Sequence, residues 1–161
     1  MVYSERYSDL AGKPTGPLSE EQARERHASG EPYAVTLGDP GSPDAVIDVA
    51  WKNDHLGVWF FDEKVRRTVH FSFQARESKL FLTTVMNWKY PDDARLRNQA
   101  SVIERVSYNP DGIIQHEVID KVAEEKTVRD ISDVDVTMNW ENIPSFGEWD
   151  SVSRFDRKRP T

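Results

Sequence analysis

The strongest constraint on the fold is a two-residue alternation of apolar and polar side chains through the middle of the chain. In the run R-R-T-V-H-F-S-F-Q, Val69, Phe71 and Phe73 fall on one face and His70 falls on the other. Successive side chains of an extended strand point to opposite faces of a sheet, so this period predicts β-strands. Similar runs across residues 33–121 are rich in β-branched and aromatic residues, which favour strands.

Short turn signals separate these runs, and strands joined by short turns pair antiparallel. One signal is N-P-D-G at residues 109–112, which predicts a type I turn with a positive φ at Gly112. The breaks define about eight to nine strands. The expected fold class is mainly β (α+β by strict count): a twisted antiparallel meander that forms a curved half-barrel or a sandwich.

Two of the expected strands carry detailed face predictions. Alternation over residues 79–90 puts Phe81 and Val85 on one face, and the other face is made of Leu80, Leu82, Met86 and Trp88. Alternation over residues 128–140 predicts a last strand whose polar face carries Asp133 and Asp135. Together with Asp130, these two acids lack the glycine and terminal glutamate of a calcium-binding EF-hand loop, so no metal site is expected there.

The ends of the chain differ from its middle. Residues 1–17 contain two glycines and two prolines and are expected to be a flexible lead-in. A surface helix is predicted from Glu20 to Ala28, with Ser19 and Gln22 as a capping box and Gly30 as the stop. A single β-rich domain is expected over residues 18–150, followed by a basic tail over residues 151–161.

The charge distribution narrows the range of partners. The formal net charge is −7, which weighs against nucleic acid because phosphate binding needs a basic surface. Residues 104–150 hold 12 acidic and four basic side chains, a net charge of −8, whereas residues 151–161 have a net charge of +3. An acidic surface of this kind favours encounter with a basic partner, although it also serves solubility.

Composition also limits location and chemistry. The chain has no cysteine, so thiol chemistry and thiolate metal sites are excluded. It shows no signal-peptide pattern and no apolar run of about 20 residues, so a cytoplasmic protein without a membrane span is expected. No phosphate loop, nucleophile elbow or metalloprotease motif occurs, so an enzyme is less expected than a binding protein, and no cofactor or catalytic residue is assigned.

The four histidines are the main candidates for chemistry. His27 on the predicted helix and His55 in a turn are expected to face solvent. His70 and His116 lie on the polar faces of two predicted strands. An enzyme that used His70 and His116 would need the two side chains to converge in one cleft.

A small-molecule carrier is the alternative to a protein-binding function. The triplet Gly57-Val58-Trp59 is similar to the G-x-W triplet of lipocalin-type ligand barrels, although here it lies on the third predicted strand rather than the first. The resemblance implies a curved sheet that holds a ligand, with Trp59, His70 and His116 as candidate ligand-binding residues. A cavity lined by Trp59 and His70 is then expected. Ordinary packing of Trp59 and its two neighbouring phenylalanines in a sheet explains the triplet equally well.

The stretch N-W-E-N-I-P-S-F-G-E-W-D, residues 139–150, has neither a helical nor a strand period. Its bulky groups fall at every third position from residue 140 to residue 149, which favours an irregular lid over the core. The leading hypothesis is a non-enzymatic acidic module that binds a basic protein, as an immunity protein neutralises a toxin. The predicted partner-binding residues are Asp133, Asp135, Glu141, Glu148, Trp149 and Asp150.

Overall fold

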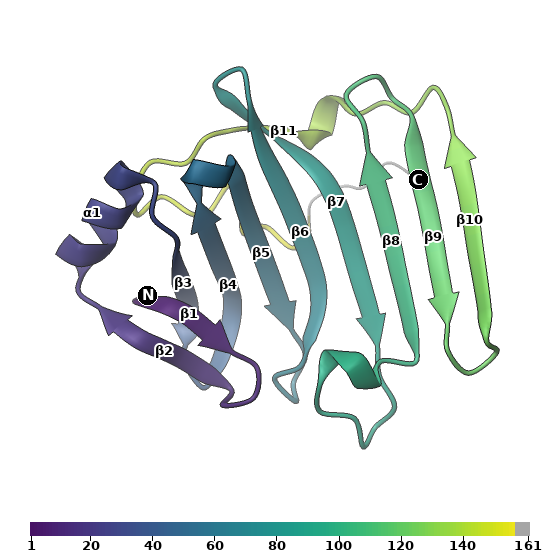
Figure 1. Cartoon of the computed structure of the whole chain (residues 1–161), viewed down its shortest axis with the longest axis horizontal. Helices are drawn as coiled ribbons and strands as arrows, with labels where there is room; N and C mark the ends of the chain where they lie inside the picture. Colours follow the sequence, from purple (N-terminus) through teal and green to yellow (C-terminus); the bar gives the residue numbers. More distant parts are fainter. Residues whose placement is uncertain (157–161) are drawn as a thin grey trace.

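The computed structural model describes residues 1–156. This part of the chain forms one antiparallel sheet of 11 strands with one α-helix and three short 3₁₀ helices (Figure 1). The strands are β1 (Val2–Ser8), β2 (Lys13–Leu18), β3 (Tyr33–Asp39), β4 (Ser42–Ala50), β5 (His55–Phe61), β6 (Arg67–Arg76), β7 (Lys79–Lys89), β8 (Val102–Tyr108), β9 (Ile114–Asp120), β10 (Glu125–Ile131) and β11 (Trp140–Asn142). The helices are α1 (Glu20–Ser29), η1 (Trp51–Asn53), η2 (Arg97–Gln99) and η3 (Thr137–Asn139).

The strand order confirms the predicted antiparallel meander. The order is β10-β9-β8-β7-β6-β5-β4-β3-β1-β2, and the short β11 pairs with one end of β7. From β3 to β10 every strand pairs with the next one along the chain. The predicted turn at residues 109–112 is also present, because the Gly112 N–H donates to the Asn109 carbonyl (3.0 Å) and Gly112 has a φ of 82°.

The first 17 residues differ from the flexible lead-in expected there. They form most of the β1–β2 hairpin, which pairs from Tyr3 opposite Leu18 to Ser8 opposite Lys13. Pro14 and Pro17 are compatible with this pairing because β2 is an edge strand, where a missing backbone N–H is tolerated. Glycine and proline therefore mark an edge here rather than a loose segment.

Helix α1 matches its sequence signals closely. The Ser19 hydroxyl accepts a hydrogen bond from the backbone of Gln22 (3.1 Å), and the Gln22 side chain accepts one from the Ser19 N–H (2.9 Å). Gly30 ends the helix with a φ of 79°, a left-handed conformation that glycine adopts at low cost. The structure thus confirms both the predicted capping box and the predicted stop at Gly30.

The sheet is bent so that one of its faces is concave. Neighbouring strands lie about 4.8 Å apart, so β1 would be far from β5 in a flat sheet with this order. Instead the Tyr7 ring of β1 lies 5.4 Å from the Phe61 ring of β5 and 5.7 Å from the Arg67 guanidinium of β6. The hairpin therefore curls over the face that also carries Trp59 and Trp88, which we call the concave face.

The opposite face is the covered face, and the C-terminal lid, residues 140–156, packs against it. Figure 1 shows this segment running behind the sheet. Trp149 is 2% exposed and Val152 is fully buried, and both belong to the main core with Tyr33 and Phe71. Phe146 packs against the same core and stacks on Tyr3 at 5.2 Å. The predicted lid is present, but Ile143, one of its four regularly spaced bulky residues, is 39% exposed and does not join the core.

The last strand, predicted over residues 128–140, is wrong in its position. The structure has β10 at Glu125–Ile131, followed by an irregular segment, η3 and the short β11. Asp133 has a φ of 58°, and the Asp135 carboxylate accepts a hydrogen bond from the Thr137 N–H (2.9 Å). Such local bonds from aspartate compete with strand pairing, so Met138, at 56% exposed, does not share a face with the buried Val136.

Candidate functional site

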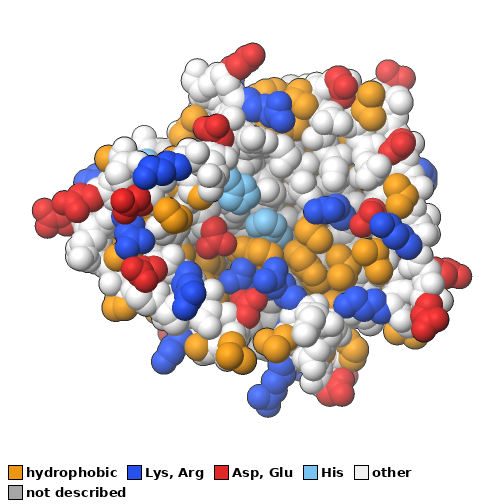
Figure 2. Space-filling view, viewed as in Figure 1, with side chains coloured by type: hydrophobic (Ala, Val, Ile, Leu, Met, Phe, Trp, Pro, Cys, Tyr) orange, Lys and Arg blue, Asp and Glu red, His pale blue; other side chains and the backbone are white. Residues whose placement is uncertain are grey.

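The concave face carries a compact group of polar and aromatic side chains, which we call the concave-face cluster. Figure 2 shows two histidines side by side near the middle of this face, with an acidic side chain beside them and basic side chains below. The register places Asp48 of β4 opposite Gly57 of β5, and Trp59 opposite His70 of β6. The cluster consists of Asp9, Asp48, His55, Trp59, Arg67, His70 and Arg97.

Trp59 is the centre of the cluster. Its indole N–H donates to the Asp48 carboxylate at 2.9 Å, and its ring stacks on the His70 imidazole at 3.9 Å. The guanidinium groups of Arg67 and Arg97 lie 4.3 Å and 4.7 Å from the ring centroid, within cation–π range. These contacts leave Trp59 only 7% exposed, so its ring fixes its neighbours rather than offering a free stacking surface.

His55 and His70 converge over Gly57, which lies between them in the sheet. A β-carbon on Gly57 would lie 2.8 Å from Nε2 of His70 and 3.2 Å from Nε2 of His55. Both ring nitrogens therefore point at one spot above the Gly57 backbone. The missing side chain at Gly57 makes room for the pair, and any larger residue would displace His70.

Burial keeps both histidines neutral at pH 7. Burial, followed by the nearby His55 and the two arginines, lowers the pKa of His70 to about 3. Burial also lowers the pKa of His55, while Asp48 opposes that shift. The same effect raises the pKa of Asp48, against the charge of Arg67 and the hydrogen bond from Trp59. A neutral imidazole has one donor and one acceptor nitrogen, so the pair can hydrogen-bond a hydroxyl or an amide.

An ion pair joins the β1–β2 turn to β6 and η2, elements that meet at the lower end of the sheet in Figure 1. Asp9, in the turn between β1 and β2, pairs with the buried Arg67 and also with Arg97 (3.3 Å). Arg67 further donates to the Tyr7 carbonyl at 3.4 Å. The burial of Arg67 lowers its pKa, but the guanidinium stays charged because its ordinary value is so high and Asp9 opposes the shift. The hairpin is thereby tied to β6 and to η2.

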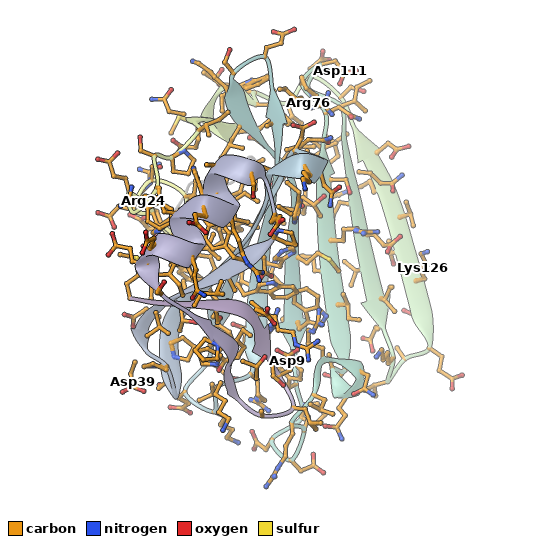
Figure 3. The ribbon with its side chains drawn as sticks, turned by 60° about the vertical axis from the view of Figure 1, so that its left-hand side comes forward. Asp9, Arg24, Asp39, Arg76, Asp111 and Lys126 are labelled. Atoms are coloured by element: carbon orange, nitrogen blue, oxygen red, sulfur yellow. The ribbon has the colours of Figure 1, made fainter. Side chains whose placement is uncertain are left out.

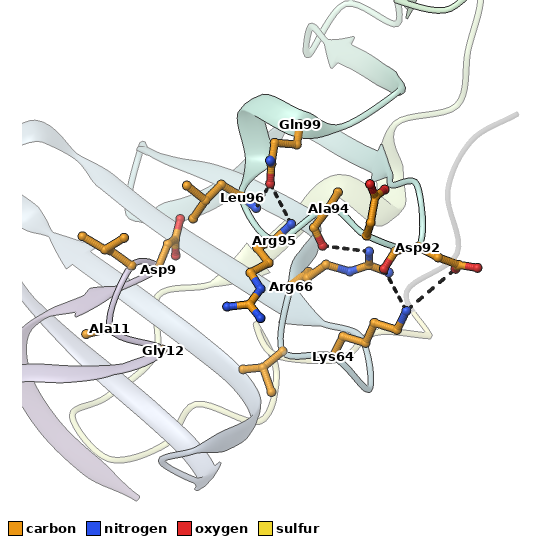
Figure 4. A pocket seen from close by; sticks show the side chains of 13 residues that line it. Asp9, Ala11, Gly12, Lys64, Arg66, Asp92, Ala94, Arg95, Leu96 and Gln99 are labelled. Atoms are coloured by element: carbon orange, nitrogen blue, oxygen red, sulfur yellow. Dashed lines mark hydrogen bonds and ion pairs between the residues drawn. The ribbon is translucent and has the colours of Figure 1, made fainter.

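A cavity of about 970 Å³, the loop-end cavity, lies beyond this ion pair (Figure 4). Its wall is held by Arg66, which donates to the carbonyls of Pro91 (2.9 Å) and Ala94 (3.2 Å), and by Lys64, which donates to the carbonyl of Asp92 (3.0 Å). Neither Trp59 nor His70 lines it, so the cavity expected around those two residues is not this one. Its lining residues are Asp9, Leu10, Ala11, Gly12, Lys64, Val65, Arg66, Asp92, Asp93, Ala94, Arg95, Leu96 and Gln99.

The structure brings together two of the three predicted ligand-binding residues. Trp59 and His70 stack, but His116 lies on the covered face. The register shows this, because Met86 is opposite His70, Arg105 is opposite Met86, and Glu117 is opposite Arg105. His116 follows on the other face and pairs with Glu104 at 3.0 Å. His70 and His116 therefore do not form the joint site that an enzyme with this pair would need.

The predicted partner-binding residues have different surroundings. Trp149 is a core residue and so is unavailable to a partner, which corrects its assignment. Glu141 pairs with Arg154 of the basic tail at 2.9 Å. The other four, Asp133, Asp135, Glu148 and Asp150, are exposed. The remaining basic side chains of the tail, at positions 157–159, lie outside the described residues.

His27 is the clearest miss among the histidines. It was expected to face solvent from α1, but its ring lies between four aromatic rings: Tyr33, Trp51, Phe146 and Trp149, at 5.5–6.2 Å. Its Nδ1 lies 2.8 Å from the Tyr33 hydroxyl, and burial lowers its pKa. His27 therefore packs α1 against the lid, and the role of this side chain is structural.

Sequence reasoning also missed Asp9, Asp48, His55, Arg67 and Arg97. For Asp48 a signal exists, since an isolated acid inside the apolar run A-V-I-D-V-A must find a partner when buried. For Asp9 and Arg97 no local signal exists, because only the curl of the sheet brings the hairpin turn to η2.

Within residues 1–156, no group of three or more potential ligand side chains is placed to hold a metal ion. No helix in this part of the chain is long and apolar enough to cross a membrane. No protein-family model, curated protein or solved structure matches the chain.

Proposed function

We propose that this protein binds a small molecule on its concave face. The observation that carries the proposal is the convergence of the two neutral imidazoles of His55 and His70 over Gly57, beside Asp48. Groups whose pKa values are shifted by burial and that share one concave surface are frequent at functional sites. The lid covers the other face, whereas His55 and His70 remain partly exposed on this one.

The side chains around the histidines define the class of ligand. Met86, Trp88 and Ile103 give one side of the concave face an apolar character. The imidazoles supply hydrogen-bond donors and acceptors without charge. A mostly apolar molecule with a hydroxyl or amide group therefore fits best, and the half-exposed Arg97 could pair with an acidic group at its end.

The Gly57→Ala variant tests this proposal. Planar aromatic amides and alcohols are screened by thermal unfolding, and a ligand at 100 times its dissociation constant is expected to raise Tm by about 5–10 °C. In Gly57→Ala the new methyl group displaces His70, so we expect the same ligand to raise Tm by less than about 2 °C.

The matched control is Gly41→Ala, where a β-carbon would meet only the Asp39 carboxylate, at 3.3 Å. This variant should keep the full ligand-induced shift. Should Gly57→Ala fail to fold, His70→Gln replaces it, because it removes the imidazole without adding volume. A ligand that stabilises all of these variants equally binds elsewhere and contradicts the proposal.

A second candidate function is that of an acidic module that binds a basic protein, such as an immunity protein and its toxin. It is favoured by the exposed carboxylates of Asp133, Asp135, Glu148 and Asp150, none of which forms an ion pair within residues 1–156. Both candidates are binding functions without catalysis, and both are compatible with a cytoplasmic location, which remains a prediction.

Neutralising these four carboxylates to amides separates the second candidate from the first. A basic protein retained by the immobilised chain at 50 mM salt should be released at 500 mM salt and should not bind the neutralised variant. A variant with amides at Glu21, Glu25, Glu31 and Glu63, which are equally exposed, should still bind. Equal retention by both variants would show that the predicted surface is not involved.

A further inference from the structure

The two edges of the sheet are built differently. At one end, β2 contains Pro14 and Pro17, which lack the N–H needed to pair with another strand. At the other end, β10 contains neither proline nor glycine over Glu125–Ile131. Proline is one of the devices that natural sheets use to block edge-to-edge association. Only the β2 edge has this protection.

Strand β10 is a regular strand with an unoccupied side. All seven of its residues pair with β9 without a bulge, from Glu125 opposite Asp120 to Ile131 opposite Ile114. Six of the seven are exposed, including Val128 at 48%, and within residues 1–156 no strand lies on its outer side. Figure 3 shows Lys126 on this outermost strand, away from α1 and the lid. The outer backbone groups are therefore available for a further strand.

We propose that β10 pairs antiparallel with β10 of a second copy of this chain, about a two-fold axis at Val128. In this register Val128 faces its own copy, and Lys126 of each chain faces Asp130 of the other. Opposite charges directly across an antiparallel pair are stabilising, and like charges are destabilising. The sequence E-K-T-V-R-D-I is thus complementary to itself in this arrangement.

Neighbouring residues are compatible with this register on both faces of the strand. On one face Lys126 contacts Glu117 of β9 (3.2 Å) and Asp130 contacts Gln115 of β9 (3.3 Å), so the pairs proposed across the interface would extend a row of polar contacts that begins on β9. On the other face Arg129 faces Thr127 of the second copy and lies diagonal to both Glu125 and Arg129 of that copy, so this face is close to neutral in the comparison of registers. One short strand pair buries less than the roughly 1,200 Å² of a standard interface, so the dimer should dissociate on dilution.

Charge reversal at the paired positions tests the proposal by sedimentation equilibrium from 5 to 500 μM. The wild-type chain should shift from monomer to dimer across this range. Lys126→Asp places Asp opposite Asp, and Asp130→Lys places Lys opposite Lys, so each should raise the dissociation constant at least about tenfold. Net charge moves in opposite directions in these two variants, so general repulsion cannot account for a loss in both.

An equimolar mixture of the two single variants should recover the dimer, because every Asp then faces a Lys across the interface. The double variant Lys126→Asp/Asp130→Lys should recover it as well. Glu63→Lys, an equal change of charge in the exposed β5–β6 turn, should dimerise like wild type. The proposal is overturned by a wild-type chain that is monomeric at 500 μM, by single variants that dimerise normally, or by a mixture that stays monomeric.

Discussion

Replacing Trp149 by alanine is expected to lower the free energy of unfolding by about 3–5 kcal/mol, the range for a large aromatic side chain lost from a core. Trp149 is 2% exposed and lies against Tyr33, His27 and Phe146, with ring centroids 6.1–6.5 Å away. The sheet is a single layer, and the lid shields much of this face from solvent. A cavity under the lid therefore opens the core to water. Urea unfolding followed by far-UV circular dichroism measures the change.

Ile143→Ala provides the control for this variant. Ile143 belongs to the same lid but is 39% exposed, so its truncation should cost less than about 1 kcal/mol. If Trp149→Ala also costs less than 1 kcal/mol, the lid does not hold the core, and the covered face would have to be regarded as accessible to ligands.

Acid is expected to destabilise the protein through its buried histidines. Burial lowers the pKa of His27 and His55, and that of His70 to about 3, below the ordinary value of 6.5. Below pH 6.5 the unfolded chain binds protons that the folded chain does not, so the free energy of unfolding falls as pH falls towards the folded-state pKa. For His70 the loss between pH 7 and pH 4 should be on the order of 2–3 kcal/mol. Asp48 acts in the opposite direction, because its raised pKa favours proton uptake by the folded state.

Comparison of variants separates the contribution of His70 to the pH dependence of stability from the contribution of the carboxylates. His70→Gln cannot titrate, so its stability should fall by about 2–3 kcal/mol less than that of wild type between pH 7 and pH 4. Gly41→Ala, which changes no titratable side chain, should follow wild type. An equal loss of unfolding free energy between pH 7 and pH 4 in all three proteins would contradict the neutral state assigned to His70.

The meander could be predicted because alternation is a local property. Residues 33–121 show a two-residue period bounded by turn signals, and each strand there pairs with the next. Alternation does not, however, predict which face of the sheet a side chain takes beyond a β-bulge. The pairing of β6 with β7 shifts at Ser72 and Phe73, so Thr83 of β7 has no opposite residue. Leu80 and Leu82 therefore join the main core, while Met86 and Trp88 belong to the concave face.

The candidate site was only half predictable. Trp59 and His70 were singled out, but their proximity depends on the β5–β6 register, and that of Asp9 and Arg97 depends on the curl of the whole sheet. The few apolar residues of α1 predict solvent exposure for His27, and this prediction is wrong. In the structure, one turn of that helix meets the lid. Long-range contacts of this kind leave no local trace in a sequence.

We propose that the pair formed by His55 and His70 is the floor of a ligand site. Long-range ¹H–¹⁵N spectra of the imidazole rings, recorded while a stabilising ligand from the thermal screen is added, test it most directly. We expect the ring nitrogens of His55 and His70 to shift in proportion to occupancy, whereas those of His116 should not shift. Saturating ligand that leaves the nitrogens of both His55 and His70 unmoved would contradict it.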